Sequence, residues 1–309
     1  MSPLHFLPLL ISLLPIPVLT NPITPRATPT TCNGNPAYCT RLYSNITFLG
    51  AHDSPFVGPL PQQNQNLEVT EQLDLGIRFL QGQTHKSLDE SDTALRLCHT
   101  SCLLEDAGTL QSFLETVKGW LDAHPDEVIT LLLTNGDSVP VARFDEAFAG
   151  AGLRDYAFVP EGSPKALAMD AWPTLAALIE KGKRLVVFLD YGADVNSVPY
   201  ILNEFTYYFE TPFGVTDAKF PSCSIDRPSG ASADGRMYIV NHFLDVEILG
   251  ILVPDRLRAP QTNAVSGSGS IGAQSALCSS LYGRKPNVVL VDFVDQGQVM
   301  KAQAALNGV

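Results

Sequence analysis

The sequence predicts an α/β fold, a (β/α)8 TIM barrel, from three observations. Several strand candidates are near-continuous apolar runs, such as residues 128–133 and 185–189. Strands buried on both faces have this pattern, and parallel sheets covered by helices bury both faces. Amphipathic stretches alternate with the apolar runs, and 309 residues suit one large barrel.

Eight strands are expected along the chain, at residues 46–50, 77–83, 94–98, 128–134, 184–190, 206–210, 237–241 and 288–292. The segment between the second and third is too short for a helix, whereas parallel strands usually need a dozen or more connecting residues. We therefore expect a barrel that is distorted or incomplete between strands two and three. An open doubly wound sheet is the alternative, but no Gly-x-Gly-x-x-Gly motif opens a helix.

Three helices are the clearest of those expected. Residues 109–123 carry their apolar side chains on one face, and Pro125 follows. A second helix covers 174–181 and is followed by Gly182, a residue suited to a left-handed cap. A third covers about 298–306.

The chain is expected to have three parts. Residues 1–20 contain no Lys, Arg, Asp or Glu and include a short apolar run, which predicts a signal peptide cleaved after Leu19. An uncleaved apolar tail is the alternative. Residues 21–42 are expected to be a flexible, disulfide-containing N-terminal segment, and residues 43–309 the barrel domain. No later stretch is long and apolar enough for a membrane helix, so the mature chain is expected to have no integral membrane segment.

The six cysteines agree with a secreted, extracellular protein. Because short loops close most readily, we expect neighbours in sequence to pair. The expected disulfides are Cys32 with Cys39, Cys98 with Cys102, and Cys223 with Cys278. A zinc site at Cys98, His99 and Cys102 is the alternative. Asn45 begins a glycosylation sequence that an exported chain could use.

The net charge of −12 disfavours two classes of partner. An acidic chain is repelled by the phosphates of nucleic acid, so no nucleic-acid partner is expected. A strongly anionic membrane surface is disfavoured for the same reason.

Functional residues of such barrels gather at the carboxyl ends of the strands. His52 and Asp53 follow the first expected strand, His99 follows the third, and Asp292 ends the eighth. Because histidine titrates near neutrality, two facing histidines can act as base and acid in one turnover. A neighbouring carboxylate can hold an imidazole in its working tautomer. His52, His99, Asp53 and Asp292 are therefore the candidate catalytic residues.

Further polar residues at the same strand ends are the candidate substrate contacts. They are Gln81, Gln83, Asn135, Asp190 and Tyr191. His85 and His242 also lie near strand ends, and for each a structural role is as good an interpretation as a functional one.

Two segments carry a family resemblance. Residues 45–55, Asn-Ile-Thr-Phe-Leu-Gly-Ala-His-Asp-Ser-Pro, look like the strand-one motif of phosphatidylinositol-specific phospholipase C X domains. Residues 70–78 resemble the Q-L-x-x-G-x-R segment of that family. His99 then takes the place of the second catalytic histidine, and residues 287–293 resemble strand eight. The chain is most similar to the secreted PLC-like phosphodiesterases.

The resemblance implies a barrel that cleaves a phosphodiester in two steps. His52 acts as the general base that deprotonates a neighbouring hydroxyl of the substrate, and this hydroxyl attacks phosphorus. His99 protonates the leaving oxygen, and the roles then reverse with water. Asp292 orients His52, and Asp53 supports His99. The implied substrate is a small-molecule or lipid-headgroup phosphodiester, either lipid-derived or glycosyl.

The chain departs from the family pattern on the second strand. Calcium-dependent members carry Glu-x-Asp where this chain has Gln81-Gly-Gln83, and neutral amides lack the carboxylates that a hard cation prefers. No metal or other cofactor is therefore expected. Metal-independent members place an Arg there, and Gln83 replaces it. Because both means of stabilising phosphoryl charge are absent, the alternative function is a catalytically weak or inactive secreted barrel that binds an inositol-like or sugar ligand.

Overall fold

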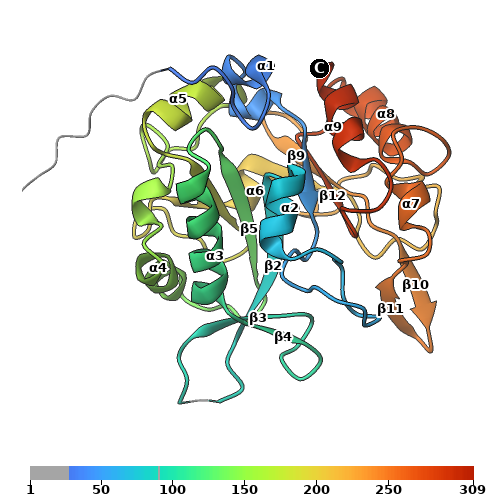
Figure 1. Cartoon of the computed structure of the whole chain (residues 1–309), viewed down its shortest axis with the longest axis horizontal. Coiled ribbons are helices and arrows are strands. Elements are labelled where there is room, and N and C mark those ends of the chain that lie inside the picture. The colour runs from blue at the N-terminus through green and yellow to red at the C-terminus, as the bar shows by residue number, and fades with distance from the viewer. Residues whose placement is uncertain (1–27, 90) are drawn as a thin grey trace, which may run out of the picture.

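The computed structural model describes residues 28–89 and 91–309 (Figure 1). The predicted signal peptide, residues 1–20, lies outside the described residues. Eight parallel strands form one curled sheet, as the sequence predicts for a TIM-barrel-like fold. They run in the order β7-β6-β5-β2-β1-β12-β9-β8. Their bounds are Phe48–Ala51 (β1), Phe79–Lys86 (β2), Ile129–Asn135 (β5), Leu185–Leu189 (β6), Ile201–Asn203 (β7), Tyr208–Glu210 (β8), Met237–Asn241 (β9) and Val288–Val291 (β12).

The barrel is open between its two edge strands, β7 and β8. Only a short helix, α6 (Glu204–Tyr207), separates them in sequence, and no ladder joins them in the described part of the chain. β7 was not predicted from the sequence, since three residues are too few to give a strand pattern.

The predicted third barrel strand, residues 94–98, is wrong. β3 (Leu95–Cys98) runs antiparallel to β2, with Thr84 opposite Leu97. β4 (Asp106–Thr109) pairs with β3 in turn. A short connection suffices for an antiparallel pair, which is the physical reason that no helix fits after β2. The irregularity predicted between strands two and three is this two-stranded extension, which β3 and β4 add to β2.

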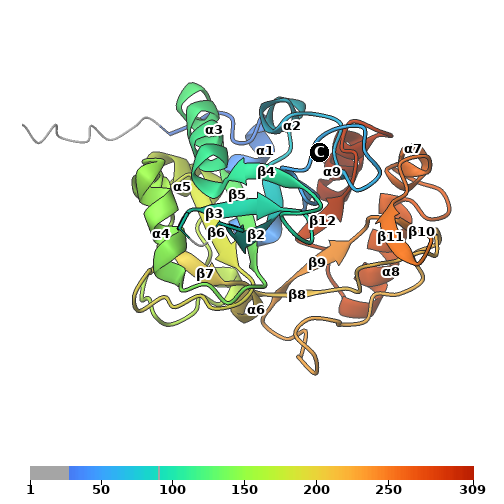
Figure 2. The same ribbon diagram turned by 90° about the horizontal axis from the view of Figure 1, so that it is seen from below.

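Helices cover the outside of the sheet (Figures 1 and 2). They are α1 (Pro36–Cys39), α2 (Val69–Leu75), α3 (Leu110–Ala123), α4 (Val141–Gly150), α5 (Leu175–Glu180), α7 (Ala259–Thr262), α8 (Ile271–Tyr282) and α9 (Val299–Asn307), with 3-10 turns at Tyr43–Asn45, Arg154–Tyr156 and Met169–Ala171. The three predicted helices match α3, α5 and α9. The Thr109 hydroxyl accepts a hydrogen bond from the Ser112 N–H and caps α3. None of the described helices is long and apolar enough to cross a membrane.

The strands are apolar throughout because both of their faces are buried. In β5, Leu131 and Leu133 pack on the helix side in one cluster with Leu114 of α3. Leu132 belongs to a second cluster inside the barrel, together with Phe188 of β6. This alternation produces the continuous apolar run seen in the sequence.

All six cysteines are paired as predicted, Cys32 with Cys39, Cys98 with Cys102, and Cys223 with Cys278. The Cys32–Cys39 loop belongs to residues 21–42, which were expected to be flexible. The described part of that segment is packed against the rest of the domain. Cys32 is fully buried, and the side chain of Asn33 bonds both backbone groups of Val128, just before β5.

A second hairpin, β10 (Asp245–Ile248) and β11 (Ile251–Pro254), follows β9. It and the β3–β4 extension project from the same lower end of the molecule in Figure 1. The parallel strands finish at this end, so it is where the functional side chains are expected.

Candidate functional site

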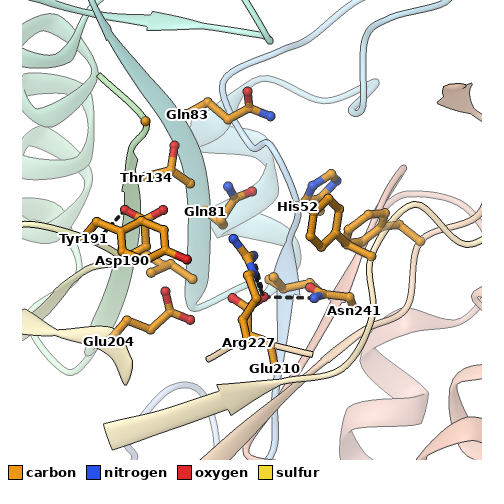
Figure 3. Close-up of a pocket in the computed structure, with 15 residues that line it drawn as sticks. His52, Gln81, Gln83, Thr134, Asp190, Tyr191, Glu204, Glu210, Arg227 and Asn241 are labelled. Atoms are coloured by element: carbon orange, nitrogen blue, oxygen red, sulfur yellow. Dashed lines mark hydrogen bonds and ion pairs between the residues drawn. The ribbon is translucent and has the colours of Figure 1, made fainter. Parts of the chain in front are cut away.

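A pocket of about 320 Å³ opens at the carboxyl ends of the strands. Figure 3 shows its polar lining. The labelled residues are His52, Gln81, Gln83, Thr134, Asp190, Tyr191, Glu204, Glu210, Arg227 and Asn241. Five of these were predicted from strand ends, namely His52, Gln81, Gln83, Asp190 and Tyr191.

His52 is fixed by strand β1 and by two neighbours. Its backbone N–H continues the pairing with β12 by donating to the Val291 carbonyl at 3.0 Å. Its ring stacks on Phe243, with centroids 3.6 Å apart and planes 6° from parallel. Nδ1 lies 2.9 Å from Oδ1 of Asp292, which leaves Nε2 as the other working nitrogen. The imidazole is therefore held in position and orientation.

Asp53 lies between the two candidate catalytic histidines. Its Oδ2 is 3.5 Å from Nε2 of His52 and 3.4 Å from Nε2 of His99. The side chain is fully buried, and φ at this residue is +44°. That left-handed conformation is uncommon outside glycine and is tolerated best by Asn and Asp. The turn after β1 thus directs one carboxylate toward both rings.

His99 lies in the loop between β3 and β4 and not at the end of a barrel strand. The Cys98–Cys102 disulfide closes this loop. The His99 ring stacks on Phe56 at 5.1 Å, and Nε2 faces Asp53. His99 therefore lies beside Asp53 in the candidate site, whereas the strand expected to carry it is part of a hairpin.

Three carboxylates, those of Asp53, Asp292 and Asp245, raise the pKa of His52 to about 9. Burial alone lowers this pKa, but the charges of Asp53 and Asp292 together outweigh the loss of solvent. Burial raises the pKa of Asp292, and its contact with His52 opposes that shift. Asn64, which the sequence analysis missed, donates a 3.0 Å hydrogen bond to Oδ1 of Asp292.

The two strand-two glutamines support Asp53. Oε1 of Gln81 accepts a 2.7 Å hydrogen bond from the Asp53 backbone N–H. Gln83 donates from Nε2 to Oδ2 of Asp53 at 2.8 Å, and its Oε1 accepts from the Thr100 N–H at 3.0 Å. Gln83 therefore connects Asp53 to the loop that carries His99.

Asn135, one of the predicted substrate contacts, makes its side-chain hydrogen bonds outside the pocket. Its side chain donates to the carbonyls of Val139 and Tyr191 and accepts from the Val139 N–H. Asn135 is absent from the described lining of the pocket, because it is used to shape the loop after β5.

Asp190 and Tyr191 do line the pocket. Oδ1 of Asp190 accepts from the backbone N–H groups of Asn135 and Tyr191. Burial raises the pKa of Asp190 to about 6, against the lowering effect of those hydrogen bonds. The Tyr191 side chain is about half exposed at the entrance.

The inner wall of the pocket is a charged group that the sequence analysis missed. Arg227 donates from Nε and Nη2 to Oε2 of Glu210, and Nδ2 of Asn241 donates to the same oxygen at 3.1 Å. Glu204 is buried beside them, and burial together with the charge of Glu210 holds its pKa well above its usual range. Glu210 ends β8, so the strand-end rule could have found it. Arg227 lies in an irregular segment without a motif.

The strand-two site does not fit a divalent cation, because the side-chain oxygens of Gln81 and Gln83 already accept hydrogen bonds from the backbone N–H groups of Asp53 and Thr100. In residues 28–89 and 91–309, the side chains grouped closely enough to hold a metal are Cys98, Cys102 and Asp106. The two cysteines are bonded to each other, so their sulfur atoms are not free as thiolate ligands.

The fold and the site define a class: an open parallel barrel with two histidines facing one carboxylate at the carboxyl end. Comparisons identify the family. The PI-PLC X family model matches residues 38–307. The chain is 58% identical over 285 residues to "PI-PLC X domain-containing protein 1" of Arthroderma benhamiae, covering 92% of each. It is 46% identical over 290 residues to an "Uncharacterized secreted protein" of the same species, covering 90% of this chain and 64% of that one.

Solved structures agree in fold. Phosphatidylinositol-specific phospholipase C from Listeria monocytogenes aligns with a TM-score of 0.55 at 16% identity, covering 87% of this chain and 95% of that one. A mutant of the Staphylococcus aureus enzyme of the same name gives 0.54 at 16% identity, over 85% and 93%. The chain belongs to the PI-PLC X domain family.

Proposed function

We propose that this protein is a metal-independent phosphoric diester hydrolase in which His52 and His99 form the acid–base pair. The substrate is a lipid-derived or glycosyl phosphodiester. One observation carries the proposal: a single buried oxygen, Oδ2 of Asp53, lies within 3.5 Å of Nε2 of both histidines. Family membership supports phosphodiester cleavage as the general chemistry.

In the first step, His52 accepts the proton of a substrate hydroxyl at Nε2. Asp292 receives the hydrogen bond from Nδ1 and keeps that proton on the far side of the ring. The hydroxyl oxygen bonds to phosphorus, the bond to the leaving alcohol breaks, and His99 donates a proton to the departing oxygen. In the second step His99 accepts a proton from a water molecule whose oxygen bonds to phosphorus, the phosphorus–oxygen bond formed in the first step breaks, and His52 returns its proton to the released hydroxyl oxygen.

One observation favours the alternative, a barrel that binds an inositol-like or sugar ligand with little turnover. Among the described residues lining the pocket, only Arg227 carries a permanent positive charge, and Glu210 pairs with it. Stabilisation of phosphoryl charge is therefore weak. The carboxyl groups of Asp190 and Glu204 are suited to accept hydrogen bonds from ligand hydroxyls.

A panel of phosphodiesters assayed with and without EDTA tests the proposal. Turnover should continue in EDTA, and His52→Ala and His99→Ala should each lower kcat by about 10²–10⁴-fold. His85→Ala is the matched control, because His85 lies on the hairpin beside Asp137 and away from the pocket. Full activity of either site variant, or activity lost in EDTA and restored by calcium, contradicts the mechanism. Ligand binding without any turnover supports the alternative.

Secretion is part of the proposal. Three disulfides support an oxidising compartment. Asn45 is exposed, as a glycosylated residue must be. Detection of the glycosylated chain in culture medium, starting near residue 20, tests the signal peptide and the modification together.

A further inference from the structure

The inner wall of the pocket is rich in carboxyl groups. Among the described residues that line it, the carboxyl groups belong to Asp190, Glu204 and Glu210, and the cationic side chains are Arg227 and His52. A phosphodiester is itself an anion, and carboxylates in a partly buried pocket repel it. The charge of this wall therefore suits a part of the substrate other than the phosphate.

Glu204 has a buried carboxyl oxygen without a partner. The residue begins α6, the short helix between the edge strands β7 and β8, and it is only 1% exposed. Within the described part of the chain, its Oε1 forms no hydrogen bond. Figure 3 shows the Glu204 side chain pointing into the pocket from the side opposite His52. A buried polar atom left unpaired costs free energy, and a donor supplied by a ligand removes that cost.

Arg227 is shared among all three carboxyl groups. It donates from Nε and Nη2 to Oε2 of Glu210. Burial lowers the pKa of the guanidinium, but the charges of Glu210, Glu204 and Asp190 raise it overall. Burial, followed by the charge of Glu210, holds the pKa of Glu204 well above its usual range. A second cation in the pocket would be attracted to this wall and would favour the ionised form of Glu204.

The arrangement of the carboxyl groups distinguishes the kinds of cation that could bind. In residues 28–89 and 91–309, the side chains grouped closely enough to hold a metal ion do not include Asp190, Glu204 or Glu210. An ammonium group on a ligand brings a positive charge and three N–H donors, as a lysine side chain does. A hydroxyl group donates one hydrogen bond and brings no charge. Three carboxyl groups that share one guanidinium therefore favour an ammonium group.

We propose that the alcohol bound in this pocket is a polyol that carries an ammonium group, which Glu204 receives with Glu210 and Asp190 beside it. The inference rests on the proposed function and names its substrate class: a phosphodiester of an amino sugar or another amino polyol, in place of a neutral ring. Glu204 and His52 lie on opposite sides of the pocket in Figure 3. The ammonium group is therefore on the part of the ring away from the hydroxyl that His52 deprotonates.

Binding of free sugars tests this site without relying on turnover. Calorimetric titration compares glucosamine and its 3-amino and 6-amino isomers with glucose, which differs from each by one hydroxyl group in place of the ammonium group. A titration with myo-inositol adds a second neutral ring. At least one amino sugar should bind the wild type about tenfold more tightly than either neutral ring. If both neutral rings bind as tightly as every amino sugar, the ammonium site is wrong.

Glu204→Gln keeps the size of the side chain and removes its charge. Its affinity for the preferred amino sugar should fall about tenfold, to that for glucose, while its affinity for glucose stays close to that of the wild type. Glu105→Gln is the matched control, because Glu105 also has a buried oxygen without a partner in the described chain but lies outside the described pocket lining. The control should keep the wild-type preference. A preference that survives in Glu204→Gln, or that is lost equally in both variants, contradicts the role of Glu204.

Turnover separates this inference from the proposed function. A preference for amino sugars without cleavage of any phosphodiester leaves the ammonium site intact and contradicts the proposed function. Cleavage of a phosphodiester of a neutral ring, without any preference for amino sugars in binding, leaves the proposed function intact and overturns the ammonium site.

Discussion

Gln83 donates a 2.8 Å hydrogen bond from its side-chain amide to Oδ2 of Asp53, the oxygen that both histidine rings approach. Its amide oxygen accepts from Thr100, next to His99. The strand-two position where the family resemblance implies a charged residue is therefore used here to connect two parts of the site. Gln83 supports the geometry but contributes no net charge toward a phosphoryl group.

Replacing Gln83 by Arg should increase turnover. An arginine at this position can still donate to Asp53, and it adds a positive charge where negative charge develops on the phosphoryl oxygens. We expect an increase of about tenfold in kcat/KM, measured on a substrate that the wild type cleaves. Gln83→Leu is the control and should reduce activity, since it neither donates nor carries charge. Equal loss of activity in both variants would contradict a role for charge at this position.

The fold was predictable where the pattern was long. Strand β5 is a run of apolar residues buried on both faces, and α3 shows a full helical period. Residues 94–98 were assigned to the barrel because a short apolar run looks the same in a parallel and an antiparallel strand. The β10–β11 hairpin was not predicted, because its side chains are exposed and its turn is Leu-Gly in place of Asn-Gly.

The candidate site was predictable where strand ends determine it. His52, Asp53 and Asp292 follow β1 and β12, which are neighbours in the sheet, and the structure brings them together. Asn135 follows the same rule, yet its amide is used by the adjoining loop. Arg227 could not be found, because it enters the pocket from an irregular segment whose path depends on tertiary packing.

The stability of the protein should decrease between about pH 6.5 and 9 through His52. The pKa of its imidazole is raised from 6.5 to about 9 by folding, so the folded state binds this proton more tightly than the unfolded chain. That stabilisation is fully present below pH 6.5 and is lost as the pH rises through 9. Urea unfolding at both ends of this range should show a loss about 1–3 kcal/mol larger for the wild type than for His52→Gln. Equal losses would show that Asp53 and Asp292 do not retain the proton.

The same pKa affects catalysis. If His52 is the general base, it must lose its proton before the first step. The acid limb of the kcat/KM profile should then lie well above 6.5 and closer to 9. Asp292→Asn removes one of the three carboxylate charges that raise this pKa, so the limb should move to lower pH while activity falls. A limb that stays in place would contradict the assignment of that limb to His52.

Asp190→Asn should stabilise the protein at neutral pH. Burial raises the pKa of this carboxyl from 3.8 to about 6, so keeping it ionised in the folded state costs free energy above that pH. An asparagine oxygen can still accept the hydrogen bonds from Asn135 and Tyr191. We expect a gain of about 1–3 kcal/mol at pH 7.5 that disappears below pH 4, measured by urea unfolding. A gain of equal size at both pH values would point to a cause other than the charge.

Removing one disulfide should mainly lower activity, whereas removing another should mainly lower the free energy of unfolding. Cys98→Ala with Cys102→Ala opens the short loop that holds His99, and we expect activity to fall at least about tenfold with a small change in stability. Cys223→Ala with Cys278→Ala opens a loop with a sequence separation of 55 and should cost about 2–5 kcal/mol while the folded protein stays active. Alkylation of the unreduced wild type should label no cysteine. The opposite ranking of the two variants would contradict the positioning role of the short loop.

The interdependence of His52 and His99 provides the most direct test of the site. Both rings approach one oxygen of Asp53, so either substitution removes part of a single proton-transfer unit. The double variant His52→Ala with His99→Ala should therefore lose little more activity than the worse single variant, because residues that act as a unit are strongly non-additive. His85→Ala combined with His99→Ala is the control, and its effects should add, since His85 pairs with Asp137 outside the pocket. Measured kcat values for the three single variants and the two double variants complete the comparison. If the effects of His52→Ala and His99→Ala multiply fully, the two histidines act independently and the shared-carboxylate mechanism is wrong.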